Sequence, residues 1–456
     1  MESISERLSE YYLNYDWEAL PPEVLEKTKE VVLDYLGCVI GGSKIESTEI
    51  VKKALVRKPC PAESRVVGDI KVPCETAAFI NGVASHGLEM DDMSSASGGH
   101  PAVVILPAAL AAAELLDAPG RELLMAVIWG YDMMTRVGSG AVPDNEFARG
   151  WHPTATNGIF GATVAVAYLM HLDAKQTANA LGIAGGFSSG NLECYADGSL
   201  TKRINPGNAA HGAIVACRLA AQGYTGPRWI FEGRSGFLKS HTDEPQPENM
   251  LKHMDYTWFP IMLASFKPYA NCRYNHSPID ALLKLMKDNA ISYKDIEEIK
   301  VDVVGGALRA VAEPAAIKYD PPNVVGAQFS LPYSISVAAI RGRAFIEEYT
   351  EAMLHDPEVR AMMPKVKIMH TGKMDAFLPT YFASEVCVRL KDGSEKTQFV
   401  QYCKGDPENP MSKEELADKF RSLARLAVSD ENKIESIIEL VSELENRNST
   451  ELCALL

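Results

Sequence analysis

The 456-residue sequence contains no long apolar run, no paired-cysteine motif and no basic cluster. Its most apolar segment, Pro101 to Leu116, includes two prolines and Glu114. It is shorter than the roughly 20 apolar residues that a membrane-spanning helix needs. We therefore predict a buried helix here and no membrane association. The opening residues "MESISERLSEYY" are polar and acidic, so we also expect no secretory signal.

None of the nine cysteines belongs to a C-x-x-C pair. In a long chain without a secretion signal, such cysteines are expected to be reduced thiols in a cytoplasmic protein. The net charge of −15 and the absence of a long Lys/Arg run argue against nucleic-acid binding. A small anionic ligand can still bind where a few basic residues converge, because the net charge does not determine local fields.

The hydrophobic pattern changes twice along the chain. Helical periodicity dominates from Pro21 to about Gly223. β-Branched alternation then occurs at Ile296–Val304 and at Ser384–Val400, where "KDGS" predicts a hairpin turn. Amphipathic helices return from Ser412, an expected N-cap with a glutamate three residues later. We predict a mainly α protein, in which a large all-helical domain (residues 1–267 plus 406–456) is interrupted by a smaller α+β lid domain (residues 268–405).

The stretch "EMDDMSSASGGHP", from Glu89 to Pro101, combines acids, a Ser/Gly-rich turn and a histidine. Asp91, Asp92 and His100 could bind a metal, but no Cys/His cluster with ligand spacing accompanies them, so no metal site is predicted. A solvated loop remains an alternative. "GFSSG" around Ser188 matches a nucleophile elbow, but a helical pattern precedes it where a strand is required. Serine-hydrolase chemistry is therefore not favoured.

Further basic residues occur in three segments that contain Gly or Pro and precede expected helices. They are "ARGWHPTATNG" with His152, "DGSLTKRINPGNAAHG" with Lys202, and "SFKPYANCRYNH" with Lys267, Arg273 and His276. Helix N-termini and cationic side chains attract carboxylates, and histidine can transfer protons near neutral pH. Together they indicate a cleft that binds a small carboxylate and removes a proton beside it. No nucleotide or flavin motif competes with this interpretation, so no cofactor is expected.

These segments resemble the MmgE/PrpD family. The resemblance extends from "LDYLGCVIGG" through "INGVASHGLEMDD", "GWHPTATNGIFGA", "TKRINPGNAAHG" and "KPYANCRYNHSPIDA" to "AQFSLPYSISVA". The family includes 2-methylcitrate dehydratase, cis-aconitate decarboxylase and iminodisuccinate epimerase. The resemblance implies a homodimer with a helical domain and a smaller lid, acting on a small di- or tricarboxylate without a metal or organic cofactor.

The resemblance also implies roles for particular residues. It implies catalytic roles for His100, His152, Tyr333 and Asp91, and substrate-binding roles for Lys202, Lys267, His276, Arg273 and Asp92. Two positions depart from the family pattern: Glu89 stands where an aspartate is common, and Met93 where a threonine or serine is common. These departures bring a standard citrate-like substrate into question.

The expected reaction is proton abstraction next to a carboxylate. In a dehydratase, the first choice, His152 would take the proton, and His100 or Tyr333 would protonate the departing hydroxide. Lys202 and Lys267 would hold carboxylates. An epimerase and a decarboxylase remain alternatives, because all three reactions pass through an enolate-like or carbanionic intermediate. A carboxylate-binding protein without catalysis is the alternative outside enzymology.

Overall fold

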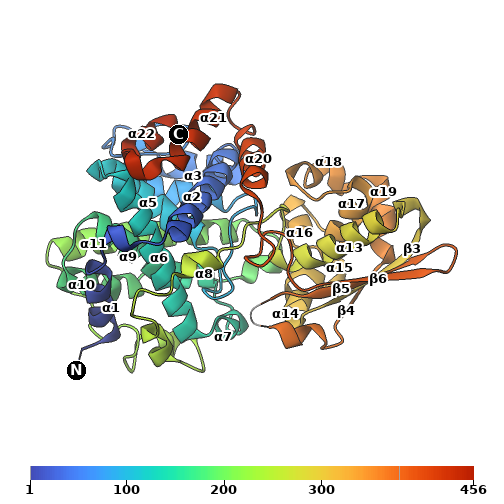
Figure 1. Cartoon of the computed structure of the whole chain (residues 1–456), viewed down its shortest axis with the longest axis horizontal. Helices are drawn as coiled ribbons and strands as arrows, with labels where there is room; N and C mark the ends of the chain where they lie inside the picture. The colour runs from blue at the N-terminus through green and yellow to red at the C-terminus, as the bar shows by residue number, and fades with distance from the viewer. Residues whose placement is uncertain (1, 379–380) are drawn as a thin grey trace.

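The computed structural model describes residues 2–378 and 381–456 and consists of two bodies of unequal size (Figure 1). Helices dominate, and the strands form one four-stranded sheet in the smaller body and one two-stranded ribbon in the larger. The predicted fold class, mainly α with a small α+β part, is therefore confirmed. The predicted domain ranges include residues 1 and 379–380, which lie outside the described part of the chain.

The larger body is a helical domain built from both ends of the chain. Its buried core runs from Ile4 to Phe266 and includes apolar residues between Leu416 and Leu456. Its elements are α1 (Ile4–Leu13), α2 (Pro22–Gly42), α3 (Glu46–Leu55), β1 (Ser64–Arg65), β2 (Lys71–Val72), α4 (Cys74–Ser85), α5 (Ala102–Leu116), α6 (Gly120–Ala141), α7 (Pro143–Ala148), α8 (Pro153–Thr156), α9 (Gly158–Leu169), α10 (Ala174–Gly185), α11 (Thr201–Ala221), α12 (Phe237–His241), α20 (Lys413–Ala424), α21 (Glu431–Ser442) and α22 (Ser449–Leu455).

Small residues allow the central helices of this domain to approach closely. A Cβ atom on Gly82 of α4 would lie 2.6 Å from the Cα atom of Gly207 in α11, so neither position has room for a side chain. Helix α5 is buried over nearly its whole length, as its sequence predicted. Within the described residues, no helix is both long and apolar enough to cross a bilayer.

The smaller body is an α+β domain in which strand order is β4-β3-β5-β6, with β3 and β4 parallel and the other pairs antiparallel. The predicted hairpin is present as β5 and β6. The main helices, α13 and α17, pack on this sheet and on each other. The elements are α13 (His276–Asp288), β3 (Ile296–Val303), α14 (Gly305–Ala307), α15 (Ala315–Lys318), α16 (Val324–Gln328), α17 (Leu331–Arg341), α18 (Glu351–Leu354), α19 (Pro357–Met362), β4 (Val366–Met369), β5 (Ser384–Leu390) and β6 (Glu395–Val400).

The chain leaves and re-enters the helical domain at one place. The backbone N–H of Phe266 donates to the carbonyl of Gly405 at 2.9 Å. Helix α20 then packs along α2, and its Lys419 side chain donates to Asp34 at 2.5 Å and to the carbonyl of Met90 at 2.7 Å. Helix α20 therefore supports the loop between α4 and α5, which carries the acidic stretch.

Candidate functional site

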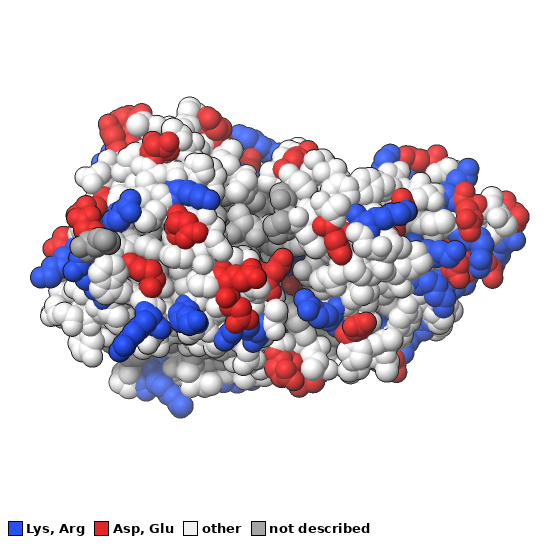
Figure 2. All heavy atoms as spheres, turned by 90° about the horizontal axis from the view of Figure 1, so that it is seen from below, with Lys and Arg blue, Asp and Glu red and all other residues white. Residues whose placement is uncertain are grey.

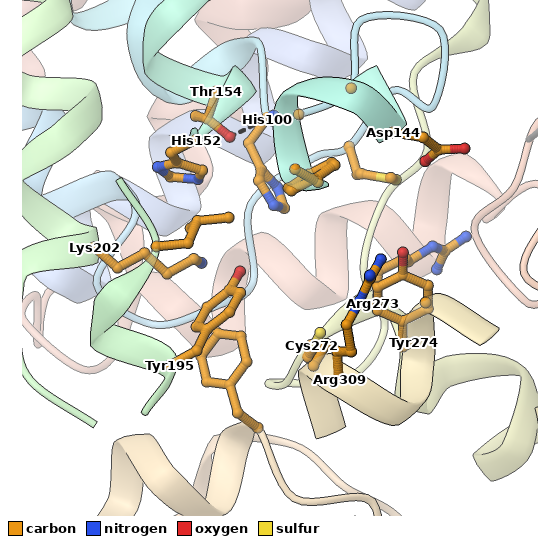
Figure 3. Close-up of a pocket in the computed structure, with 18 of the residues that line it drawn as sticks. His100, Asp144, His152, Thr154, Tyr195, Lys202, Cys272, Arg273, Tyr274 and Arg309 are labelled. Atoms are coloured by element: carbon orange, nitrogen blue, oxygen red, sulfur yellow. Dashed lines mark hydrogen bonds between the residues drawn. The ribbon is translucent and has the colours of Figure 1, made fainter. Parts of the chain in front are cut away.

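A cavity of about 740 Å³ lies at the junction of the two domains (Figure 3). The helical domain contributes residues from the α4–α5 loop, α7, the start of α8 and the start of α11, and the smaller domain contributes residues around Arg273 and Arg309. On the face shown in Figure 2, acidic and basic side chains are interspersed, so that face carries no continuous basic field. Inside the cavity, by contrast, lysine and arginine side chains are available to attract an anion.

The α4–α5 loop is pressed against the start of α8. A Cβ atom on Gly99 would lie 2.7 Å from the backbone nitrogen of Thr154, so only glycine fits without displacing backbone. The N–H of His100 donates to the Thr154 hydroxyl at 3.3 Å. Because His152 is the N-cap residue of α8, this contact brings both histidines to one wall of the cavity.

Asp91 lies behind this wall and holds two histidines. Its Oδ2 atom is 2.8 Å from Nδ1 of His86 and 3.1 Å from Nδ1 of His100. Burial alone would raise the pKa of Asp91, but His86, Lys267 and His100 together hold this pKa well below its usual value. The His100 Nδ1 atom is also 2.6 Å from the carbonyl of Asp92. With two oxygen acceptors at Nδ1, His100 carries a hydrogen there, and its Nε2 is free to accept a proton.

His152 has the opposite hydrogen-bonding arrangement. The amide nitrogen of Asn205 donates to its Nδ1 at 3.1 Å and also to the carbonyl of Asn191 at 3.2 Å, which fixes the orientation of the amide. Neutral His152 therefore carries its hydrogen on Nε2. Burial, reinforced by nearby Lys202, lowers the pKa of His152 well below its usual value. The ring is neutral at physiological pH and can donate a hydrogen bond into the cavity.

Glu89 joins the two lysines that line the cavity. Lys202 donates to Oε1 of Glu89 at 2.5 Å, and Lys267 donates to Oε2 at 3.4 Å. Burial opposes ionisation of Glu89, but Lys202 and then Lys267 lower its pKa to about 2. Lys267 is also 3.8 Å from Asp91. Each lysine retains ammonium donors for a substrate oxygen, while two neighbouring carboxylates balance their charge.

Arg273 lines the smaller-domain side of the cavity, but its guanidinium is already engaged. It forms an ion pair with Asp406 and donates to Nδ1 of His276 at 2.9 Å. His276 is fully buried, contacts the carbonyl of Asn271 through Nε2 at 3.3 Å and does not line the cavity. In this structure His276 contacts Arg273 and not the cavity, and its substrate-binding role stays a prediction.

The structure places Asp92 and Tyr333 away from the cavity lining. The Asp92 carboxyl group accepts from the Tyr131 hydroxyl at 2.7 Å and from the N–H of Ala102 at 3.0 Å, so it anchors the start of α5. Tyr333 is fully buried in the smaller domain's core, where its hydroxyl donates to the carbonyl of Glu348 at 2.6 Å. Neither residue lines the cavity in this structure, so substrate binding by Asp92 and proton donation by Tyr333 gain no support from their placement and stay predictions.

Of the nine residues expected at the site, five line the cavity and Asp91 supports one of them. The five are His100, His152, Lys202, Lys267 and Arg273. Sequence reasoning did not single out His86 and Asn205, which contact site residues, or Tyr195 and Arg309, which line the cavity, and it treated Glu89 only as a departure from the family pattern. His86 and Asn205 lie inside the segments that were singled out, so the signal was present. Tyr195 and Arg309 lie in segments without a motif.

The remaining sequence expectations concern metals and serine chemistry. Within residues 2–378 and 381–456, no group of three or more His, Cys, Asp or Glu side chains is arranged to hold a metal ion. All nine cysteines are free thiols. Ser188 follows α10 in a loop, and its hydroxyl donates to the carbonyl of Thr156 at 3.0 Å. No strand leads into it, as the sequence indicated.

Comparison with known proteins places two family models on the chain. The MmgE/PrpD N-terminal domain matches residues 6–250, and the MmgE/PrpD C-terminal domain matches residues 269–444. The second match includes α20 and α21, which pack on the helical domain. Family membership therefore agrees with a fold in which the chain passes through the smaller domain and returns.

Two cis-aconitate decarboxylases are among the relatives. The protein from Aspergillus terreus (strain NIH 2624 / FGSC A1156) is 27% identical over 95% of this chain and 91% of its own length. The Homo sapiens protein is 27% identical over 94% and 89%. The mitochondrial 2-methylcitrate dehydratase of Yarrowia lipolytica (strain CLIB 122 / E 150) is more distant, at 22% over 83% and 76%. The resemblance seen in the motifs is confirmed: the chain belongs to the MmgE/PrpD family.

Proposed function

We propose that this protein is a lyase of the MmgE/PrpD family that acts on a small polycarboxylate, with His100 transferring a proton at the carbon next to a carboxylate. The observation that carries the proposal is the Asp91–His100 pair at the cavity wall, with Nδ1 of His100 held by oxygen acceptors. This geometry leaves Nε2 as the basic atom and stabilises the imidazolium that forms when it takes a proton.

The other polar groups of the cavity suit the negative charge that develops. When a proton or CO₂ leaves the carbon, the electron pair spreads onto the neighbouring carboxylate. Lys202 and Lys267 supply ammonium donors to that carboxylate, and neutral His152 supplies its Nε2–H. This assignment makes His100 the base and His152 a hydrogen-bond donor, whereas the sequence analysis gave the role of base to His152 and protonation of the departing hydroxide to His100 or Tyr333.

Decarboxylation of a cis-aconitate-like substrate is the first reaction to test, because cis-aconitate decarboxylases cover most of this chain at 26–27% identity. In this reaction the C–C bond to the departing CO₂ breaks, and the electron pair delocalises. Protonated His100 then supplies the proton for the new C–H bond. Neutral His100 regains a proton from water before the next turnover.

Dehydration is the second candidate, supported by the 2-methylcitrate dehydratase relative. Here neutral His100 takes the proton next to the carboxylate, and the released electron pair forms the C=C bond as the C–O bond breaks. The imidazolium then gives its proton to the departing hydroxide. The same cavity groups serve both reactions because both place negative charge on the same carboxylate.

The test is proton NMR of the purified protein in deuterated water with cis-aconitate, 2-methylcitrate, citrate and iminodisuccinate in turn. Loss of CO₂ or of water identifies the lyase reaction, and His100→Ala should abolish it while leaving the circular dichroism spectrum unchanged. Deuterium uptake without elimination would favour the epimerase alternative. Binding without any reaction on all four would contradict the proposal and favour a carboxylate-binding protein.

A further inference from the structure

The cavity contains five cationic side chains, and they differ in whether an acidic partner already neutralises them. Lys202 and Lys267 share Glu89, Arg273 is paired with Asp406, and Arg149 is paired with Asp243 at 2.6 Å. Among the residues that the structure describes, Arg309 is the one cation of this set without a hydrogen bond or ion pair.

Arg309 occupies an unusual backbone position. It lies in a π-helical turn, Leu308–Ala312, that directly follows the short helix α14. Such turns are rare, and they are frequent at functional sites because they redirect side chains that a regular helix would place elsewhere. Here Arg309 and the adjacent Ala310 line the cavity, so the turn directs an uncompensated guanidinium into it.

The position of Arg309 in the cavity complements the catalytic wall. Figure 3 shows His152 and Lys202 on one side of the cavity, and Arg309, Cys272 and Tyr274 on the side formed by the smaller domain. A carboxylate bound by the lysines and polarised by His152 leaves the rest of the molecule to extend toward the smaller domain. On that side, Arg273 is already paired with Asp406, and the guanidinium of Arg309 has no acidic partner among the described residues.

We infer that Arg309 binds the distal carboxylate of a tricarboxylate substrate and thereby selects tricarboxylates over dicarboxylates that lack this group. This inference rests on the proposed function. A guanidinium presents parallel N–H donors that match both oxygens of a carboxylate, so the contact would add geometric specificity as well as attraction. Because Arg309 belongs to the smaller domain, the contact would also connect that domain to a substrate whose reacting end lies against the helical domain.

One other arrangement could use the same guanidinium. Asp144 in α7 lines the cavity from the helical domain and, like Arg309, has no ion-pair partner among the described residues. Both side chains act on the hydroxyl of Tyr274, whose pKa is raised mainly by burial. The charge of Asp144 raises this pKa further, and the charge of Arg309 lowers it. Closure of the cavity could pair Arg309 with Asp144 in place of substrate. The two arrangements predict opposite effects of removing the charge of Asp144.

The experiment is calorimetric measurement of Kd for two unreactive probes that differ by one terminal carboxylate, tricarballylate and methylsuccinate. We expect wild-type protein to bind tricarballylate more tightly. Arg309→Gln should raise the Kd of tricarballylate by about 10- to 100-fold, because a charged hydrogen bond is lost. The Kd of methylsuccinate should stay within about twofold of its wild-type value. Arg341→Gln is the matched control, because Arg341 is an exposed arginine of the same domain that does not line the cavity.

The variant Asp144→Asn distinguishes the two arrangements. Substrate contact by Arg309 predicts tighter tricarballylate binding in this variant, since an anion is removed from the cavity. Weaker binding, matching that of Arg309→Gln, would instead indicate an Arg309–Asp144 pair and overturn the inference. An equal loss for both probes in Arg309→Gln, or no loss, would overturn it as well.

The outcome also separates this inference from the proposed function. If wild-type protein turns over a polycarboxylate but Arg309→Gln binds both probes like wild type, only the role of Arg309 fails. If wild-type protein binds neither probe and transforms none of the four candidate substrates, both fail together.

Discussion

The Oδ2 atom of Asp91 lies 3.1 Å from Nδ1 of His100 and 2.8 Å from Nδ1 of His86, so one buried carboxylate serves two imidazoles. His86 does not line the cavity, and its Nε2 has no hydrogen-bond partner among the described residues. Burial, assisted by Lys202, lowers the pKa of His86 to about 4, so this ring is neutral near pH 7. His100 is then the histidine of the pair that can exchange protons with a bound substrate.

Asp91→Asn should lower kcat by roughly 10²- to 10⁴-fold, because an amide can present a donor to Nδ1 and release His100 from the tautomer that leaves Nε2 free. The fold should persist, since the amide is similar in size to the carboxylate. Steady-state kinetics with the substrate found above, together with a circular dichroism spectrum, checks this. Unchanged kcat in a folded variant would remove Asp91 from the mechanism.

Asn205→Asp should disable His152 by reversing its hydrogen-bonding arrangement. A carboxylate cannot donate to Nδ1, so the hydrogen would move from Nε2 to Nδ1, and the pKa of His152 would rise beside the new negative charge. We expect at least a tenfold loss of kcat and a change of tautomer in the nitrogen NMR spectrum of the histidines.

The matched control for this change is Asn208→Asp. Asn208 lies in the same helix, and its amide donates to the Ser189 hydroxyl at 3.1 Å, without lining the cavity. This variant should keep the wild-type kcat and tautomer. If both variants lost activity equally, added negative charge and not the Asn205–His152 bond would be responsible.

Asp92 should make the protein less stable as the pH rises. Burial, supported by the nearby carboxylates of Asp34 and Asp91, raises the pKa of Asp92 to about 8 against the opposing hydrogen bond from Tyr131. Between about pH 4 and pH 8, the folded state therefore holds a proton that the unfolded state has released, and stability falls with increasing pH.

The measurement is the urea midpoint of wild type and Asp92→Asn at pH 5 and pH 8. An asparagine cannot ionise. The urea midpoint of the variant minus that of wild type should therefore be larger at pH 8 than at pH 5. A difference between the two proteins that is the same at both pH values would show that Asp92 ionises normally in the folded state.

Lys419→Met should destabilise the folded protein by about 3–5 kcal/mol, because it leaves the fully buried carboxylate of Asp34 without its cationic partner. It also removes the hydrogen bond to the carbonyl of Met90, next to Asp91. Chemical denaturation measures the loss. Lys413→Met, which breaks the exposed pair with Glu26 at 2.6 Å on the same helix, is the control and should change stability by less than about 1 kcal/mol. Similar effects of the two variants would contradict a supporting role for Lys419.

Much of this protein could be predicted from local sequence. Helical periodicity, the Pro-containing start of α2, the Ser412 cap of α20 and the β5–β6 hairpin all depend on interactions between residues close together in the chain. The histidines and lysines of the cavity were identified because they occur beside Gly- and Pro-rich turns in motifs with a family resemblance. These features are local, so the sequence by itself determined them.

Only the tertiary structure decided which polar groups face the cavity. Asp91 and Asp92 are neighbours in sequence, yet one supports His100 and the other anchors α5, because consecutive side chains in this loop point to different surroundings. Tyr333 belongs to a recognised motif but lies in a core, and Arg309 belongs to none but lines the cavity. The direction of a side chain and the partners that neutralise its charge depend on segments far apart in the chain, such as those that pair Glu89 with Lys267 and Lys419 with Asp34. No local pattern encodes those pairings.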